Sequence, residues 1–112
     1  MYKYIPFIDE NVAIADYATV SNRALSNDQL WDKIAEDFQF AVDNLPATQT
    51  EIGRANKAAA LAYLAKTKLY QAYEQDEQNN VTVINKTKLQ QVVDLINAIP
   101  STYGLDSDFG DL

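Results

Sequence analysis

The chain has 112 residues, 47% of them hydrophobic and 22% charged, which is enough apolar material for the core of one compact domain. Asp and Glu outnumber Lys and Arg by 16 to 9, and the resulting net charge of -7 argues against a nucleic-acid partner, because such a surface repels phosphate. His and Cys are both absent, which excludes disulfides, thiolate nucleophiles, Ser-His-Asp triads and zinc sites built from imidazole or sulfur. We therefore expect a protein that is not an enzyme and that carries no cofactor.

The first 25 residues show neither a sustained helical period nor strand alternation, so they are predicted to form an irregular or partly extended arm. Pro6 and the acidic pair Asp9-Glu10 interrupt the apolar start, and no signal-peptide pattern is visible there. No apolar run approaches the roughly 18–20 residues that span a bilayer. The chain itself is expected to be soluble.

A first helix is predicted over residues 27–45. Ser26 or Asn27 can cap its first turn through a side-chain oxygen, and Pro46 ends it. Apolar residues recur at spacings of three and four and form one stripe, which predicts the buried face: Trp31, Ile34, Phe38, Ala41 and Leu45.

A second helix is predicted over residues 54–73, where Ala, Leu, Lys and Gln give high helix propensity. One face carries small residues that would let another helix approach closely: Ala58, Ala62, Ala65, Leu69 and Ala72. We expect this face to pack antiparallel against the first helix, with Phe38 and Ala62 in one buried cluster.

Residues 74–80 are polar and predicted to be a loop or a frayed helix end, and residues 81–84 are too few to assign. Asn85 or Thr87 can cap a third helix over residues 86–99, which Pro100 ends. The predicted fold is a single all-α domain over residues 1–112, built from antiparallel helical hairpins behind the N-terminal arm.

The first predicted helix carries a recognisable pattern of residues. Ile34, Phe38, Ala41 and Pro46 follow one another at the intervals seen in the second helix of a tetratricopeptide repeat, so the hairpins are expected to be of that type.

A longer stretch is more specific. It combines the segment from Ile34 to Pro46, which reads I-x-x-D-F-x-x-A-x-x-x-L-P, with Gly53-Arg54-Ala55-Asn56-Lys57-Ala58-Ala59-Ala60 and with Leu64-Ala65-x-x-x-Leu69-Tyr70. These residues resemble the helical scaffold of the SusD/RagB family of nutrient-binding outer-membrane lipoproteins from Bacteroidetes. The resemblance is strongest over residues 25–73.

The resemblance implies a function for a longer parent protein. Family members carry a lipidated N-terminal Cys, lie at the outer membrane on the cell surface, and bind oligosaccharides or peptides together with a SusC-like TonB-dependent transporter. The chain is therefore expected to be a fragment that contains the scaffold and reaches the membrane only through the parent's lipid anchor. Glycan-contacting aromatic residues of the family lie mostly on loops outside this scaffold, so the resemblance assigns no ligand residue here.

The candidate ligand-binding residues are Tyr63, Tyr70 and Tyr73, which are spaced along one side of the second helix. Tyrosine rings can stack on sugars, but such a stripe more often packs against protein, and we expect packing here. Trp31 heads the apolar stripe and is expected in the core rather than as a sugar platform. Three helices alone should offer a convex or shallow surface, so weak oligosaccharide binding, or none, is expected of this fragment.

Three other features could suggest sites. Gly53-Arg54 could bind an anion at a helix start, although an ion pair between Arg54 and Glu51 is the simpler interpretation. Asp32 and Glu36 share a helix face but are expected to be solvated rather than catalytic. The tail at Asp106, Asp108 and Asp111 lacks the length and the closing Glu of a calcium loop, so no metal is expected.

Two functions remain open at this point. One is the scaffold portion of a surface glycan-binding protein that takes part in polysaccharide uptake. The alternative is a free-standing tetratricopeptide-like adaptor that binds another protein between its helices.

Overall fold

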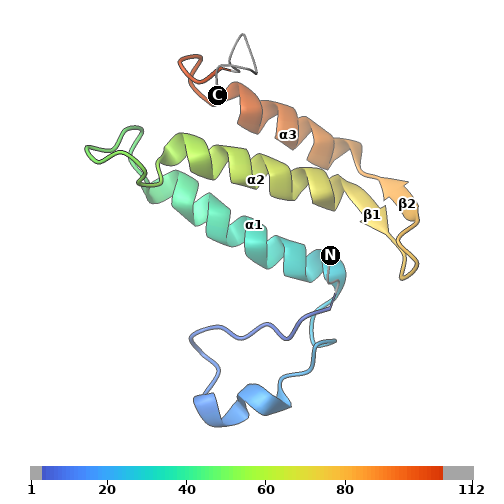
Figure 1. The fold of residues 1–112 in the computed structure, drawn as a ribbon. Helices are drawn as coiled ribbons and strands as arrows, with labels where there is room; N and C mark the ends of the chain where they lie inside the picture. Colours follow the sequence, from blue (N-terminus) through green and yellow to red (C-terminus); the bar gives the residue numbers. More distant parts are fainter. Residues whose placement is uncertain (1–3, 105–112) are drawn as a thin grey trace, which may run out of the picture.

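The computed structural model describes residues 4–104 of the chain. Three helices lie side by side in one layer, α1 (Asn27–Asn44), α2 (Lys57–Ala72) and α3 (Lys86–Asn97), with α2 in the middle and successive helices running in opposite directions (Figure 1). Two short strands, β1 (Tyr73–Gln75) and β2 (Val81–Ile84), form an antiparallel hairpin between α2 and α3. The fold is thus mostly helical, as predicted, but the prediction of an all-α domain is wrong, because the chain also forms this two-stranded sheet.

The N-terminal arm is largely irregular, as predicted, and contains one 3-10 helix, η1 (Ile14–Thr19). Arg23 joins the arm to the rest of the chain, because its guanidinium lies 3.5 Å from the ring centre of Tyr4 and 3.2 Å from Glu77 of the hairpin turn. These are exposed contacts, which contribute little to stability individually.

Side-chain caps set the starts of α1 and α3. Ser26 accepts a hydrogen bond from the Gln29 N–H, and the Gln29 side chain accepts one from the Ser26 N–H, which completes a capping box. Asn85 caps α3 by accepting from the Lys88 N–H. α3 ends at Asn97 rather than at residue 99, because the residue before Pro100 is disfavoured in a helical conformation.

The second helix begins three residues later than the predicted residue 54. Asn56 is its cap and accepts a hydrogen bond from the Ala59 N–H at 3.0 Å. The segment before it is fixed in a non-helical path by Gly53, which has a φ of 93°, and by the Gln49 side chain, which donates to the Ala55 carbonyl. A cap and a turn therefore override the helix propensity of Arg54 and Ala55.

The core lies between the three helices. Its buried members are Ala35 and Val42 of α1 with Ala60, Leu61 and Leu64 of α2. Half-buried apolar residues pack around them from α1, from α3 and from the residues that directly follow these two helices: Phe38, Ala41, Leu45, Leu95 and Ile99. The predicted α1 stripe is therefore only partly right: three of its members pack against the core, but Trp31 and Ile34 do not, and the buried α1 residues Ala35 and Val42 lie outside the stripe.

The predicted small-residue face of α2 is only partly right. Ala58, Ala65 and Ala72 are buried, but Ala62 and Leu69 are exposed, so Ala62 does not join a buried cluster with Phe38. α2 has a neighbouring helix on each side, α1 and α3. When successive residues are placed 100° apart around the helix axis, the buried residues of α2 occupy about half of its circumference. That buried half is centred on Leu61 and Leu64, so the predicted stripe lies along its margin.

The hairpin was not predicted: residues 74–80 were expected to be a loop or a frayed helix end, and residues 81–84 were left unassigned. Tyr73 pairs with Ile84, Glu74 with Val83, and Gln75 with Val81. In the turn, Asp76 accepts hydrogen bonds from the N–H groups of Gln78 and Asn80, and Asn79 adopts a left-handed φ of 70°. Asn tolerates that conformation better than most residues, so the polar run closes a turn instead of fraying.

Candidate functional site

Two aromatic pairs line the seam between α1 and α2. Trp31 stacks on Tyr70 with ring centres 5.4 Å apart and planes 9° from parallel, and Phe38 stacks on Tyr63 with nearly the same geometry. In both helices the paired residues are seven positions apart in opposite chain order, which agrees with antiparallel packing. The expected packing of Tyr63 and Tyr70 is thus observed, yet they remain 56% and 47% exposed.

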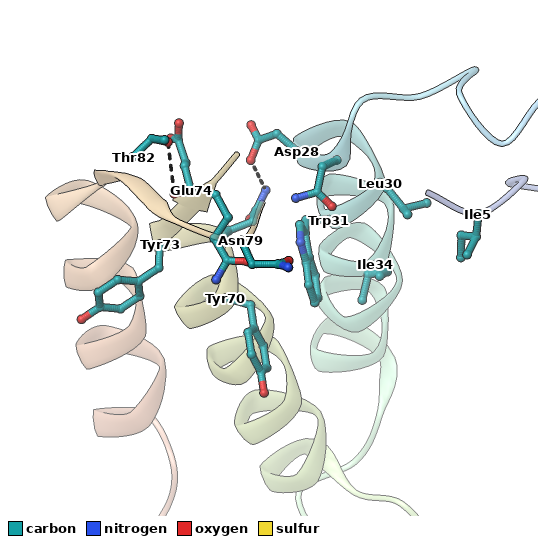
Figure 2. A pocket seen from close by; sticks show the side chains of 13 residues that line it. Ile5, Asp28, Leu30, Trp31, Ile34, Tyr70, Tyr73, Glu74, Asn79 and Thr82 are labelled. Atoms are coloured by element: carbon teal, nitrogen blue, oxygen red, sulfur yellow. Dashed lines mark hydrogen bonds between the residues drawn. The ribbon is translucent and has the colours of Figure 1, made fainter. Parts of the chain in front are cut away.

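The three candidate tyrosines do not form one platform. Tyr73 belongs to β1, and its side chain is directed away from the Trp31–Tyr70 pair (Figure 2). Tyr63 lies two helical turns before Tyr70 and does not line the pocket that Tyr70 borders. Of the predicted candidates, Tyr70 and Tyr73 contribute to that pocket.

The pocket has a volume of about 520 Å³ and lies where the start of α1, the end of α2 and the hairpin meet (Figure 2). Trp31 and Tyr70 form its aromatic wall, and Leu30 and Ile34 of α1 add apolar surface. Trp31 is therefore half-buried beside a pocket, rather than enclosed in the core as predicted. The polar lining comes from seven residues: Asn27, Asp28, Gln71, Glu74, Gln75, Asn79 and Thr82.

A hydrogen-bond network fixes one side of the pocket. The Gln71 side chain is 2% exposed, and its Nε2 donates to Asp32 Oδ1 at 2.6 Å and to Asp28 Oδ1 at 3.3 Å. Lys88 Nζ of α3 donates to the same Asp28 oxygen at 2.8 Å. The network links all three helices, so it holds Asp28 and Gln71 in fixed positions.

Asp32 and Glu36 have separate hydrogen-bond partners. Asp32 accepts from Gln71, whereas Glu36 accepts from Lys33 Nζ at 2.9 Å. The hydrogen bond and charge of Glu36 raise the pKa of Lys33 above its ordinary value. Each carboxylate thus has its own partner, and Asp32 is not simply solvated as predicted, because it accepts from the buried Gln71 of α2.

In the Gly53-Arg54 segment, Arg54 forms the expected ion pair with Glu51. Arg54 Nε lies 2.6 Å from Glu51 Oε2, as expected, and α2 begins only at Lys57. Within residues 4–104, no cluster of three or more acidic side chains is arranged to hold a metal ion. The acidic tail at Asp106, Asp108 and Asp111 lies outside the described residues.

The sequence prediction missed the pocket residues on the hairpin: Glu74, Gln75, Asn79 and Thr82. The available signal was the Val-Thr-Val-Ile run after an Asp- and Asn-rich segment, which is typical of a strand after a turn. That signal covers only four residues, and it does not identify the strand's partner.

Comparison with known proteins assigns no family, since neither the models of known protein families nor the curated proteins match this sequence. In the described part of the chain, no helix combines the length and the apolar character needed to cross a membrane.

Proposed function

We propose that this chain is the helical scaffold portion of a SusD/RagB-like surface protein that binds glycans or other nutrients. In this proposal the parent protein is a lipoprotein of the outer membrane and works with a SusC-like TonB-dependent transporter in polysaccharide uptake. The scaffold carries out no chemistry and holds the binding surface in place.

One observation supports this proposal most directly: several of the residues that carry the resemblance pack the helices together. Phe38 and Ala41 of α1, and Leu45 directly after it, pack around the core, and Ala60 and Leu64 of α2 lie within it. Asn56, from the same motif, caps α2. The motif therefore specifies a helix layer, which is the role that a scaffold requires.

The full gene and its product test the proposal. We expect an upstream lipidation Cys and several hundred further residues downstream of Leu112. The tagged full-length protein should be recovered from the outer membrane together with a TonB-dependent transporter, and protease added to intact cells should degrade it. A product without a lipid anchor, recovered with cytoplasmic proteins, would contradict the proposal.

The second candidate is a tetratricopeptide-like adaptor. Val93 and Ile96 are about half exposed on α3, which packs on α2. An apolar helix face of this kind can receive another helix. Co-purification with one helical partner in fixed proportion, in the absence of any transporter, would favour the adaptor.

A further inference from the structure

We propose that the pocket between α1, α2 and the hairpin is itself a binding subsite for a neutral oligosaccharide. This inference deepens the proposed function and rests on it for the biological source of the ligand. It also goes beyond the expectation from the sequence, because three helices alone would leave a shallow surface, whereas the hairpin supplies a further wall.

The shape and the aromatic wall fit a sugar. A volume of about 520 Å³ lies within the usual range for small-molecule sites, roughly 300–1,000 Å³. The stacked Trp31 and Tyr70 rings both border the pocket, and sugar C–H groups can pack on the aromatic surface that the stack leaves uncovered.

The polar side chains that line the pocket offer both hydrogen-bond donors and hydrogen-bond acceptors. Among residues 4–104, no hydrogen-bond partner is found for the side chains of Asn27, Glu74, Gln75 and Asn79, which all line the pocket. Three of these are carboxamides, each with two N–H donors and an acceptor oxygen. Sugar hydroxyl groups both donate and accept, so they can match this lining.

The charges argue against other ligand classes. The pocket lining contains Asp28 and Glu74 but no Lys or Arg, so an anionic ligand would find no positive lining side chain and would be repelled by two carboxylates. An ammonium group could use the carboxylates and the aromatic rings, but it only donates hydrogen bonds and offers no acceptor for the carboxamide N–H groups. Asp28 is moreover already paired with Lys88. A neutral polyhydroxyl ligand is therefore the best match.

The test uses the intrinsic fluorescence of the full chain, because Trp31 is its only tryptophan and reports on this pocket alone. The probes are neutral hexasaccharides of the malto, cello, xylo and manno series. We expect a saturable change with at least one of them. The absence of any saturable change up to about 10 mM, or roughly 3 kcal/mol of binding free energy, would overturn the proposal.

Matched variants locate the binding. Tyr70→Ala should weaken it at least about tenfold, equivalent to about 1.4 kcal/mol. Tyr63→Ala removes an equivalent stack outside the pocket and should leave binding unchanged. Asn79→Gly removes a lining carboxamide at a left-handed position that Gly adopts freely, so it should weaken binding without loss of helicity. Equal losses in Tyr63→Ala and Tyr70→Ala would contradict the subsite.

Glu74→Gln separates the ligand classes. The carboxamide keeps the acceptor oxygen and removes the charge, so sugar binding should persist. A response only to an amine such as N-acetyl-lysine amide, lost in Glu74→Gln, would assign the pocket to a cation instead. If the parent takes up glycan with a transporter but Tyr70→Ala changes nothing, only the subsite is wrong. If the subsite binds sugar but no transporter associates, only the proposed function is wrong.

Discussion

Ala62 and Ala65 lie three residues apart on α2, yet only Ala65 is buried, with 1% of its surface exposed. Both belong to the same predicted small-residue face. The difference arises because the core is centred on Leu61 and Leu64, which places Ala65 within the packed half of the helix and Ala62 beyond its edge. Spacing alone identifies the stripe, but the neighbouring helices decide which of its members are covered.

Ala65→Leu should destabilise the protein by about 1–3 kcal/mol, because a fully packed site has no room for three additional carbon atoms. Ala62→Leu is the matched control on the same helix and should change stability by no more than about 0.5 kcal/mol. Denaturant unfolding followed by circular dichroism measures both. Equal effects of the two substitutions would show that the packed face of α2 is misplaced.

At the scale of the elements, the start of α2 depends on Asn56. Its side-chain oxygen caps the helix, and its Nδ2 donates to the Tyr103 hydroxyl at 3.0 Å. The residue therefore fixes the start of α2 and also holds the segment that follows α3 against it.

Asn56→Ala should cost about 1 kcal/mol, since it leaves the Ala59 N–H without its cap. Asn56→Asp keeps the capping oxygen, and its second carboxylate oxygen can accept a hydrogen bond from the Tyr103 hydroxyl in place of the one that Asn56 donates, so it should retain most of the stability. Thermal and denaturant unfolding of both variants give the comparison. If Asn56→Ala were as stable as the wild type, α2 would begin elsewhere.

At the scale of the whole molecule, Gln71 links the three helices. Its amide donates to Asp32 and Asp28 of α1, and Asp28 in turn accepts from Lys88 of α3. The two aspartates are exposed, but Gln71 is not, so its hydrogen bonds cannot be replaced easily by water.

Gln71→Ala should destabilise the fold by about 1–3 kcal/mol, through the loss of charge-assisted hydrogen bonds and buried contacts. Gln39 provides the control, because it makes the same type of bond to Asp43 on an exposed helix face. Gln39→Ala should cost no more than about 0.5 kcal/mol. Comparable losses for the two variants in denaturant unfolding would contradict a linking role for Gln71.

Metal removal should leave the thermal stability of the whole molecule unchanged. The acidic tail has neither the loop length nor the closing Glu that calcium requires, so EDTA is expected not to shift the Tm in a thermal melt. A shift of several degrees, reversed by added calcium, would point to an ion bound at Asp106, Asp108 or Asp111.

The sequence by itself determined the three helices, because their limits depend on local interactions. Ser26 and Asn85 cap the first turns through nearby N–H groups, and Pro46 and Pro100 prevent the helices from continuing. The sequence also singled out Trp31 as a core residue and Tyr70 as a candidate ligand-binding residue, but it did not predict that their rings stack on each other. The late start of α2 was missed because the Asn56 cap competes with the good helix propensity on either side of it.

Only the tertiary structure decided the rest. The pairing of β1 with β2, the covered half of α2 and the Trp31–Tyr70 stack all depend on contacts between residues far apart in the chain. The candidate pocket depends on such contacts as well, since it brings Asp28 beside Gln71 and Asn79 beside both helices. Local periodicity cannot encode these distances, because the free energy that sets them comes from the joint packing of three helices and a hairpin.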